Sequence, residues 1–396
     1  MNLGIDITFL DTLDEKQGVN RYAMGIINEL KNTNKYKIQI YTNQKIYKDA
    51  KKKFLSKKIN VYQLNSSYEV IKKIFYFFLV FLGFFNIYFF KLHYLFINLI
   101  NEKEKKFIED KSDILIFLNA QDISYNFDIK TIINFHDLLH KRFPNFFSKK
   151  ELILREYVYR NSSFNSDVLI ASSFFMKREF LKFYYFLKNK RIIIMREGIN
   201  KKIFNLQNVI KKKNRKREFI FYPAQLWYHK NHLTLLKAFK IISLKQKKLQ
   251  LILCGSKKNN FLNILNYIKL NSLQNRVKYL GNISQKKLEH YYKNCLLVVL
   301  PSLYESSSLV ALEAIKMKKP VVCSNISPML ELKNKFKLIY FNSNSSNSLV
   351  KSLVFAIKNK KKLKKYCRYN YQNLNDFNWQ KTTLVLQKEI LKLSKN

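Results

Sequence analysis

The sequence predicts an α/β protein made of two doubly wound parallel-sheet domains, and three observations lead to this fold class. The chain has 396 residues, which is more than one hydrophobic core usually fills. Hydrophobic residues make up 47% of it, with only 7 Gly and 5 Pro, so it can bury a large core and lacks the composition of a disordered chain. Short apolar runs alternate with segments of helical period, a pattern typical of parallel sheets covered by helices.

The apolar runs fall into two sets on either side of a basic stretch. The first set is expected to form buried strands of an N-terminal domain at residues 36–42, 113–119, 131–137, 167–173 and 191–198. The second set is expected to form strands of a C-terminal domain at residues 218–224, 249–255, 277–281, 296–302, 320–325 and 337–342. Helix-period segments such as NHLTLLKAFKIISLKQ separate members of the second set.

The basic stretch itself, residues 201–218, has weak periodicity and is interpreted as the linker between the domains. We therefore expect an N-terminal domain at 1–200 and a C-terminal domain at 201–379. A final helix at 380–396 is expected to cross back to the first domain.

One segment departs from the pattern of a soluble domain. Residues 74–90 read IFYFFLVFLGFFNIYFF and are followed by KLHYLFINLI. This apolar run is just short of the ~20 residues of a spanning helix, and Asn86, Lys91 and His93 interrupt it. A buried core helix, a helix lying in a membrane surface and a transmembrane helix all remain open. Lysine-rich flanks at 51–58 and 101–106 favour contact with anionic lipid over simple burial.

The charge of the chain is strongly positive. It has 73 Lys and Arg against 27 Asp and Glu, a formal net charge of +46. Such a balance is typical of proteins that meet nucleic acid or anionic membranes, although AT-rich coding also enriches Lys together with Ile, Asn, Phe and Tyr. No basic-aromatic motif for reading nucleic acid is recognisable. We therefore expect an anionic membrane surface and no nucleic acid as partner.

Cysteine usage and the N-terminus both favour the cytoplasm. The four cysteines show no C-x-x-C spacing and no clustering with histidine, which disfavours a zinc site or a disulfide framework. The first residues carry acids where a secretion signal would carry bases, and they include no long apolar run.

The candidate site follows from the rule that open α/β sheets bind ligands beyond the carboxyl ends of their strands. Residues 301–325, PSLYESSSLVALEAIKMKKPVVCSN, end an apolar run and place Glu305 and Glu313 eight positions apart around three serines. The helix that carries Glu313 would begin at the serines. Its first backbone N–H groups lack helical partners, and the helix dipole makes this end attractive to phosphate.

This stretch resembles the Glu-x7-Glu signature of the retaining, family-four (group 1) glycosyltransferases with the GT-B fold. Six further stretches match that family in the same order along the chain: KQGVNRYAMGIINEL, FHDLLHKRFPNFFS, DVLIASSFFMKREFLKFY, YPAQLWYHKNHLTLLKAF, LILCGS and YLGNIS. The resemblance covers nearly the whole chain apart from residues 74–100. It implies two Rossmann-like domains that face a cleft, with a nucleoside-diphosphate sugar bound mainly by the second domain.

The resemblance also implies roles for individual residues. Lys230 matches the lysine that faces the diphosphate, Glu305 the glutamate near the transferred sugar, and Glu313 the glutamate that contacts the ribose hydroxyls. His136 matches a histidine that reaches the reaction centre from the first domain. The other donor-binding positions that it implies are Gly18, Gln225, Gly255, Asn282, Ser306, Ser307, Ser308 and Leu309. Ordinary structural roles stay open for these residues, among them a plain loop glycine at 18 and a structural histidine at 136.

Two positions depart from the family pattern. Many members have Gly-Arg where this chain has Ala224 and Gln225, so one diphosphate cation is missing. The glycine-rich stretch after the first glutamate is replaced by three serines. Serine keeps the backbone donors but restricts positive φ.

The implied reaction moves a sugar from a nucleoside diphosphate to an acceptor hydroxyl with retention, without a metal or other cofactor and without a protein nucleophile. The sequence has no D-x-D pair of the kind that holds a divalent cation and no phosphate-binding loop of the ATPase type. The expected acceptor is a growing surface glycan of lipopolysaccharide, O-antigen or capsule type, free or lipid-linked, reached at the cytoplasmic face of the inner membrane. The alternative is a non-catalytic nucleotide-sugar-binding subunit, motivated by Gln225 and the three serines.

Overall fold

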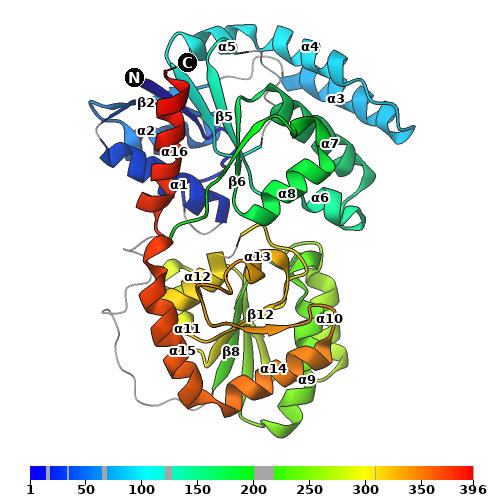
Figure 1. Cartoon of the computed structure of the whole chain (residues 1–396). Helices are drawn as coiled ribbons and strands as arrows, with labels where there is room; N and C mark the ends of the chain where they lie inside the picture. Colours follow the sequence, from blue (N-terminus) through cyan, green and yellow to red (C-terminus); the bar gives the residue numbers. More distant parts are fainter. Residues whose placement is uncertain are drawn as a thin grey trace. The chain divides into compact units, whose positions relative to one another are not determined.

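The computed structural model describes residues 1–14, 18–33, 35–64, 69–120, 127–199, 218–307 and 309–395. The chain forms two compact units, each with its own parallel sheet (Figure 1). Unit 1 comprises Met1–Gly198 together with Trp379–Asn396, and unit 2 comprises Ile199–Asn378.

The described residues of unit 1 contain a seven-stranded parallel sheet in the order β3-β2-β1-β4-β5-β6-β7. Its strands are β1 (Asn2–Asp6), β2 (Lys37–Thr42), β3 (Ile59–Gln63), β4 (Ile114–Phe117), β5 (Lys130–Phe135), β6 (Val168–Ala171) and β7 (Arg191–Ile194). The chain reverses its direction across the sheet between β1 and β4, which is the switch point of a doubly wound sheet. The central strands are buried throughout, as expected for a sheet with helices on both faces.

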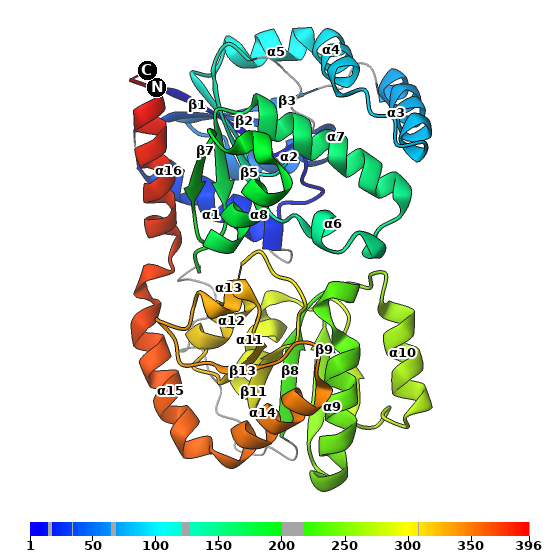
Figure 2. The same ribbon diagram turned by 45° about the vertical axis from the view of Figure 1, so that its right-hand side comes forward.

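The helices of unit 1 cover both faces of this sheet, with α1, α2 and α16 on one and α7 and α8 on the other (Figures 1 and 2). The helices of the unit are α1 (Gly18–Asn32), α2 (Gln44–Phe54), α3 (Glu69–Phe84), α4 (Phe90–Ile100), α5 (Glu102–Glu109), α6 (Leu139–Arg142), α7 (Lys149–Asn165), α8 (Phe174–Phe183) and α16 (Trp379–Leu393). A capping box formed by Ser148 and Glu151 begins α7.

The C-terminal helix α16 belongs to unit 1 through specific contacts. A Cβ atom on Gly25 of α1 would lie 2.3 Å from the indole of Trp379, so only glycine lets the two helices approach this closely. The Trp379 ring also meets Tyr22 edge-on at 5.7 Å between centroids. Farther along α16, Glu389 accepts hydrogen bonds from the Arg191 guanidinium, one of them at 2.8 Å from Nη2 to Oε2.

Among its described residues, unit 2 has a six-stranded parallel sheet in the order β10-β9-β8-β11-β12-β13. The strands are β8 (Phe219–Pro223), β9 (Gln250–Cys254), β10 (Val277–Tyr279), β11 (Leu297–Leu300), β12 (Val321–Ser324) and β13 (Ile339–Phe341). The helices are α9 (His232–Lys245), α10 (Phe261–Leu270), α11 (Gln285–Asn294), α12 (Leu309–Lys316), α13 (Ser327–Leu330), α14 (Ser346–Lys358) and α15 (Lys360–Gln372). Here the chain reverses direction between β8 and β11.

The predicted fold class is confirmed, and all eleven predicted strands are present within a few residues of their expected bounds. Two strands, β1 and β3, were missed. In β1 only Leu3 and Ile5 are large apolar residues, and β3 lies at the sheet edge, where only Ile59 and Val61 are buried. Both strands are too mixed in polarity to stand out as apolar runs. The predicted linker 201–218 lies outside the described residues except for its last position.

The apolar segment at 74–100 folds as the last part of α3, a turn and α4. Asn86 has a left-handed φ of 61° in the turn that follows α3. Of the helices in the described ranges, none is both long and apolar enough to cross a membrane. The four cysteines are buried and free of disulfides.

Candidate active site

The candidate site in unit 2 lies at the carboxyl ends of β8 and β11, where the sheet reverses its order. The connections that follow two adjacent strands leave towards opposite faces of the sheet at such a point, and this is where ligands bind in open α/β sheets. The loop after β8 carries Gln225, Trp227 and Lys230, and the loop after β11 carries Ser302 and Glu305.

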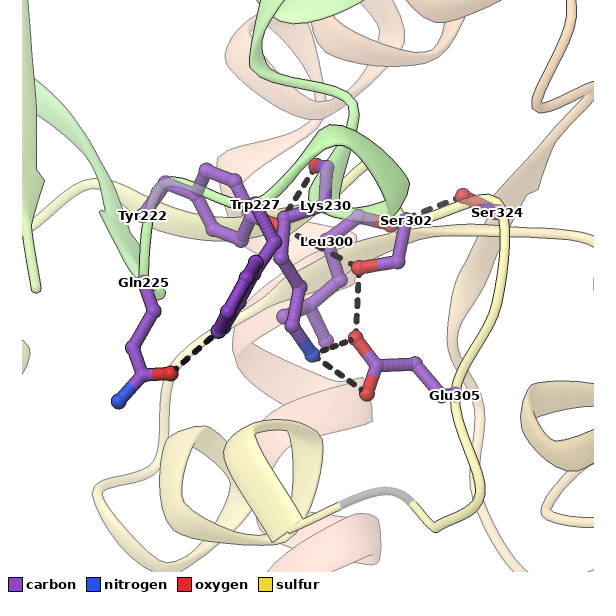
Figure 3. A network of polar contacts seen from close by, with 8 residues as sticks. All are labelled: Tyr222, Gln225, Trp227, Lys230, Leu300, Ser302, Glu305 and Ser324. Atoms are coloured by element: carbon purple, nitrogen blue, oxygen red, sulfur yellow. Dashed lines mark hydrogen bonds and ion pairs between the residues drawn. The ribbon is translucent and has the colours of Figure 1, made fainter. Parts of the chain in front are cut away.

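An ion pair joins these two loops. Lys230 Nζ lies 2.7 Å from Oε1 and 2.8 Å from Oε2 of Glu305 (Figure 3). Ser302 Oγ donates a third hydrogen bond, 2.6 Å long, to Oε1. Both charged side chains retain a little less than a fifth of their surface exposed. The pair is therefore mostly, but not completely, shielded from water.

Buried hydroxyl groups support this ion pair through hydrogen bonds. The hydroxyl of Tyr222, on β8, donates to the Lys230 carbonyl at 2.8 Å and lies 3.3 Å from Ser302 Oγ (Figure 3). Burial raises the pKa of Tyr222 well above its usual value, and the negative charge of Glu305 adds to this effect. The phenol therefore stays protonated and can serve as a fixed hydrogen-bond donor.

The turn that presents Lys230 is fixed by its neighbour Asn231, whose left-handed φ of 55° ends a single 3-10 turn and begins α9. Its side-chain amide donates to the carbonyls of Pro301 and Ser343, each at 3.0 Å. A backbone hydrogen bond of 2.8 Å from Leu303 to the His229 carbonyl joins the same two loops again. These hydrogen bonds thus fix the loops after β8 and β11 relative to each other.

Two histidines beside Lys230 are neutral at pH 7. Burial, followed by the positive charge of Lys230, lowers the pKa of His229 to about 2 and that of His232 to about 3. These two histidines therefore add no positive charge beside Lys230 at neutral pH.

Glu313 lies deeper than Glu305. It projects from α12 and is only 2% exposed. The Tyr292 hydroxyl, from α11, donates a hydrogen bond of 2.7 Å to its Oε2 atom. The structure therefore places the two glutamates differently: Glu305 in a loop beside a lysine, and Glu313 in a helix beside a buried phenol.

The loops after β8, β9 and β10 contact one another. Gly255 has a φ of +141°, and a Cβ there would lie 2.3 Å from the Ala224 carbonyl oxygen, so glycine is required. The Gly255 N–H donates to the Gly281 carbonyl at 3.0 Å. Asn282 Oδ1 accepts from Ser256 Oγ at 3.2 Å.

Gln225 makes a side-chain contact within its own loop. Its Oε1 atom accepts a 2.8 Å hydrogen bond from Trp227 Nε1 (Figure 3). Lys258 Nζ lies 4.8 Å from the centroid of the Trp227 ring. The Gln225 amide is therefore held by the indole N–H of Trp227, and Lys258 lies over the ring of the same indole.

The serine stretch leads into α12. Ser306 and Ser307 form a bend before the helix, and Leu309 is its first residue. Ser308 lies outside the described residues.

The two predicted site residues of unit 1 have different surroundings. His136 follows β5, and its Nε2 atom lies 3.1 Å from the Leu118 carbonyl oxygen. Because a carbonyl only accepts, this nitrogen carries the proton. Burial lowers the pKa of His136 to about 4, with the nearby Asp137 charge acting in the opposite direction. Gly18 is the exposed first residue of α1, and a Cβ there would meet nothing within 4 Å among the described residues.

Sequence reasoning missed three residues that organise the site: Tyr222, Tyr292 and Ser302. Tyr222 and Tyr292 lie inside a strand and a helix, where they read as ordinary core aromatics. Ser302 directly follows the β11 run, so its position at a strand end was a signal that could have found it.

Comparisons with known proteins agree with this geometry. Residues 205–373 match the family model described as glycosyl transferases group 1. Two uncharacterised glycosyltransferases of Methanocaldococcus jannaschii are 31% identical over 116 residues and 24% identical over 246 residues, which cover 29% and 62% of this chain. These matches span 29% and 65% of the relatives' own lengths, less than two thirds in each case. The O-antigen chain mannosyltransferase B of Escherichia coli is 21% identical over 209 residues, 51% of this chain and 55% of that protein.

Solved structures match over nearly the whole chain. The sucrose-phosphate synthase of Thermosynechococcus elongatus has a TM-score of 0.75 at 17% identity, with 100% of this chain and 99% of that chain covered. Anabaena HepE in complex with UDP and glucose has a TM-score of 0.71 at 14% identity, with 99% of this chain and 100% of that chain covered. At these identities the likeness concerns the fold, which is that of the GT-B glycosyltransferases.

Proposed function

We propose that this protein is a retaining, metal-independent glycosyltransferase that moves a hexose from a nucleoside-diphosphate sugar to a hydroxyl of a growing surface glycan. The observation that carries the proposal is the Lys230–Glu305 ion pair at the switch point of unit 2. It brings a cation and a carboxylate from two neighbouring strand ends to one place. The same region lies within the match to the glycosyltransferase model.

The donor diphosphate is assigned to Lys230 and to the backbone N–H groups that begin α12. Negative charge grows on the diphosphate as the bond to the sugar breaks, and fixed cations and dipoles stabilise that charge most effectively where water is restricted. Upon donor binding, the ammonium of Lys230 would exchange one of its Glu305 contacts for a phosphate oxygen. Glu305 would then accept hydrogen bonds from hydroxyls of the transferred sugar.

The remaining donor contacts are assigned to the loops around this pair. Glu313 is proposed to accept hydrogen bonds from the ribose hydroxyls, since a carboxylate offers two acceptor oxygens. Gln225, Gly255 and Asn282 lie in the loops that would meet the nucleoside. Ser306 and Ser307 precede α12 and Leu309 is its first residue; these three, with Ser308, are proposed as further donor contacts. Gly18 and His136 of unit 1 are proposed to complete the reaction centre.

Retention is proposed to arise from attack of the acceptor on the face that the diphosphate leaves. The acceptor hydroxyl forms the new glycosidic bond, the bond to the diphosphate breaks, and the hydroxyl proton passes to the departing diphosphate oxygen. No protein nucleophile is required. Metal independence is supported by the absence of a D-x-D pair in the sequence, and no cofactor beyond the nucleotide sugar is proposed.

The class of donor and acceptor is supported by the relatives. One matching structure contains UDP and glucose, and one relative is a mannosyltransferase of O-antigen chains. A further structural match, WaaG, is described as a glycosyltransferase involved in lipopolysaccharide biosynthesis. We accordingly propose an acceptor of lipopolysaccharide, O-antigen or capsule type, and a peripheral position on the cytoplasmic face of the inner membrane.

A second candidate is a nucleotide-sugar-binding subunit that does not catalyse transfer. The observation that favours it is the Gln225–Trp227 hydrogen bond, because a neutral amide held in this way occupies the position where the resemblance to the group 1 glycosyltransferases implies an arginine. Such a protein would bind a nucleoside diphosphate but would not hydrolyse or transfer the sugar.

Thermal unfolding of the purified protein with UDP, GDP, ADP or CDP, with and without EDTA, tests the donor site. A rise in Tm with one nucleotide that EDTA does not change, and that Glu313→Ala abolishes, is the expected result. Incubation with the corresponding labelled nucleotide sugar then separates the two candidates, because only the enzyme releases the sugar. A folded protein that no nucleotide stabilises would overturn both.

A further inference from the structure

Helices α3 and α4 of unit 1, with the turn between them, carry an apolar surface on the outside of the protein. The large hydrophobic side chains on α3 follow a helical spacing, so that they form one stripe along the helix. They are Ile74, Phe77, Phe78, Phe81 and Phe84, all exposed. Phe77 is 75% exposed, which is unusual for a phenylalanine in a folded domain. Both views draw α3 and α4 at the margin of unit 1, beyond α7 (Figures 1 and 2).

The stripe continues through the turn and along α4. The turn exposes Phe85, Ile87, Tyr88 and Phe89, and α4 exposes Leu92, Leu95 and Leu99. Leu95 is 54% exposed and Leu99 is 74% exposed. Contiguous exposed apolar patches of this kind mark interaction surfaces, whereas single exposed apolar residues are common.

The opposite face of the same helices is firmly packed. Leu79 and Val80 are buried against Ile153 and Tyr157 of α7. A Cβ on Gly83 would lie 2.7 Å from Ile153, so α3 and α7 approach closely. The helix pair therefore already has a hydrophobic contact with the rest of unit 1, and its outer stripe is additional to that core.

A few polar contacts fix the turn and α4 in the same position. The Phe89 N–H donates to the Tyr157 hydroxyl at 3.1 Å. His93 of α4 is fully buried, and its Nε2 atom lies 3.2 Å from the Tyr76 hydroxyl. The outer stripe is consequently presented on a fixed support.

The charged residues within the segment that carries this surface have one sign. Residues 70–101 contain no Asp or Glu. Lys73 and Lys91 are exposed beside the stripe. At its rim, Lys149 Nζ donates to the Phe84 carbonyl at 2.7 Å and lies 5.2 Å from the Phe84 ring centroid. Arg160 lies 4.6 Å from the ring centroid of Phe90.

We propose that this outer surface of α3 and α4 docks on an anionic lipid bilayer, with the aromatic stripe in the interfacial layer and the rim cations on lipid phosphates. Apolar rings flanked by Lys and Arg are the combination that membrane interfaces favour, because hydrophobic burial and attraction to acidic headgroups then add. A second copy of the chain fits less well, since pairing two such faces would bring their cations together. The helices insert in the plane of the membrane and do not cross it.

The docking surface explains how a protein with the proposed function would be held at the membrane. It rests on the proposed function only for the choice of membrane, and it does not depend on sugar transfer. It defines a specific anchor: the outer faces of two helices of unit 1. An acceptor carried by lipid would then be held at the surface to which the protein is bound.

The test is flotation of the full chain with vesicles of phosphatidylglycerol and phosphatidylcholine, or of phosphatidylcholine alone. The test variant combines Phe77→Ser, Phe81→Ser and Leu95→Ser. The matched control combines Leu244→Ser, Leu262→Ser and Leu270→Ser, which remove three exposed leucines from α9 and α10 of unit 2. A second variant, Lys73→Gln with Lys91→Gln, examines the charges.

We expect the unaltered protein and the control to float with the anionic vesicles, and the test variant to partition at least about tenfold less, since three large apolar groups are lost from the contact. The lysine variant should retain part of the binding and lose its preference for phosphatidylglycerol. Equal flotation of the test variant and the control would overturn the proposal. So would absence of flotation of the unaltered protein, or light scattering that shows a dimer which only the test variant converts to monomer.

Nucleotide-induced thermal shifts on the same preparations keep the two proposals separate. The test variant should retain the shift of the unaltered protein, because the outer stripe lies in unit 1 and the donor site in unit 2. Loss of flotation with an unchanged shift would locate the defect at the membrane surface. Unimpaired flotation without any nucleotide shift would refute the donor site alone.

Discussion

The Tyr292 hydroxyl donates a 2.7 Å hydrogen bond to Oε2 of Glu313, and both side chains are buried. The phenol comes from α11 and the carboxylate from α12, so the bond fixes the carboxylate from a neighbouring helix. A buried carboxylate depends on such donors, because withdrawing it from water is costly unless its oxygens are hydrogen-bonded.

Replacement of Tyr292 by phenylalanine should therefore weaken binding of the nucleoside diphosphate with little change in packing. We expect a loss of about 1–3 kcal/mol in stability, the usual effect of leaving a buried polar group without one partner. Isothermal titration with the stabilising nucleotide measures the affinity, and urea unfolding measures the stability. Tyr291→Phe on the same helix is the control. If Tyr292→Phe bound the nucleotide as tightly as the control, Glu313 would not need this contact for donor binding.

Lys230 and Glu305 should have separable roles in spite of their ion pair. Lys230→Ala removes the cation proposed for the diphosphate, so it should raise the Kd for the nucleotide. Glu305→Gln keeps the shape of the side chain and should lower kcat about a hundredfold, the usual scale for losing one preorganised electrostatic contact. Steady-state kinetics over a range of donor concentrations distinguish the two effects. Equal losses of Tm and of activity in both variants would indicate that the pair is structural only.

His136 should support turnover as a neutral side chain. Its lowered pKa, about 4, leaves the imidazole uncharged at neutral pH. We expect His136→Ala to lower kcat more than it changes KM for the donor. The pH profiles of the unaltered enzyme and of His136→Ala should therefore have the same shape near pH 6.5. A titration near pH 6.5 that is present in the unaltered enzyme and absent from His136→Ala would contradict the neutral role.

Stability should fall as the pH is lowered from about 6.5 towards 4. A histidine whose pKa is lower in the folded state binds fewer protons there than in the unfolded chain, so its contribution to stability is complete above the unfolded pKa and is lost on acidification. Five histidines have pKa values lowered chiefly by burial: His93, His136, His140, His229 and His232.

The effect of a single histidine can be isolated at position 93. His93→Gln should reduce the loss of unfolding free energy between pH 6.5 and 4 by about 1–3 kcal/mol, the scale of a pKa shift of this size, as measured by urea unfolding at each pH. Replacement of the exposed His290 by glutamine is the control. An identical pH dependence in both variants would show that His93 does not contribute.

Two glycines of α1 should respond in opposite ways to alanine. At Gly25 the added methyl group would collide with the Trp379 indole, so overpacking should cost about 1–3 kcal/mol. At Gly18 the space is open, and the substitution should leave stability unchanged or raise it, because alanine favours the helix. If the donor approaches the backbone of Gly18 closely, Gly18→Ala should lower kcat/KM, while the Tm of the variant stays that of the unaltered protein. Full activity of that variant would reduce Gly18 to a plain helix-start glycine.

Most strands could be predicted because strands buried on both faces are continuous apolar runs. The strands β8, β9 and β11 are of this kind, and their order with helices between them already predicts a doubly wound sheet. The strands β1 and β3 could not be found in this way, because few of their residues are apolar and both become strands through pairing with β2.

The candidate site was predictable where its residues directly follow strands. Glu305 and Lys230 stand out in this way, and Ser302 could have. The contacts of Tyr222 with Ser302 and of Tyr292 with Glu313 could not be predicted, because they join residues that are 80 and 21 positions apart in the sequence. Nor does periodicity distinguish the two apolar faces of α3, of which one is packed on α7 and the other is exposed.

The sequence by itself determined the α/β class, the division of the strands into two sets, the excess of positive charge and the position of Glu305 and Glu313 around a strand end, because these follow from local composition and spacing. Only the tertiary structure decided that Lys230 pairs with Glu305, that Tyr292 holds Glu313, and that the aromatic segment is two helices with an exposed face. Those outcomes depend on which surfaces meet when the chain packs, and close packing selects one set of long-range contacts that no short window of sequence specifies.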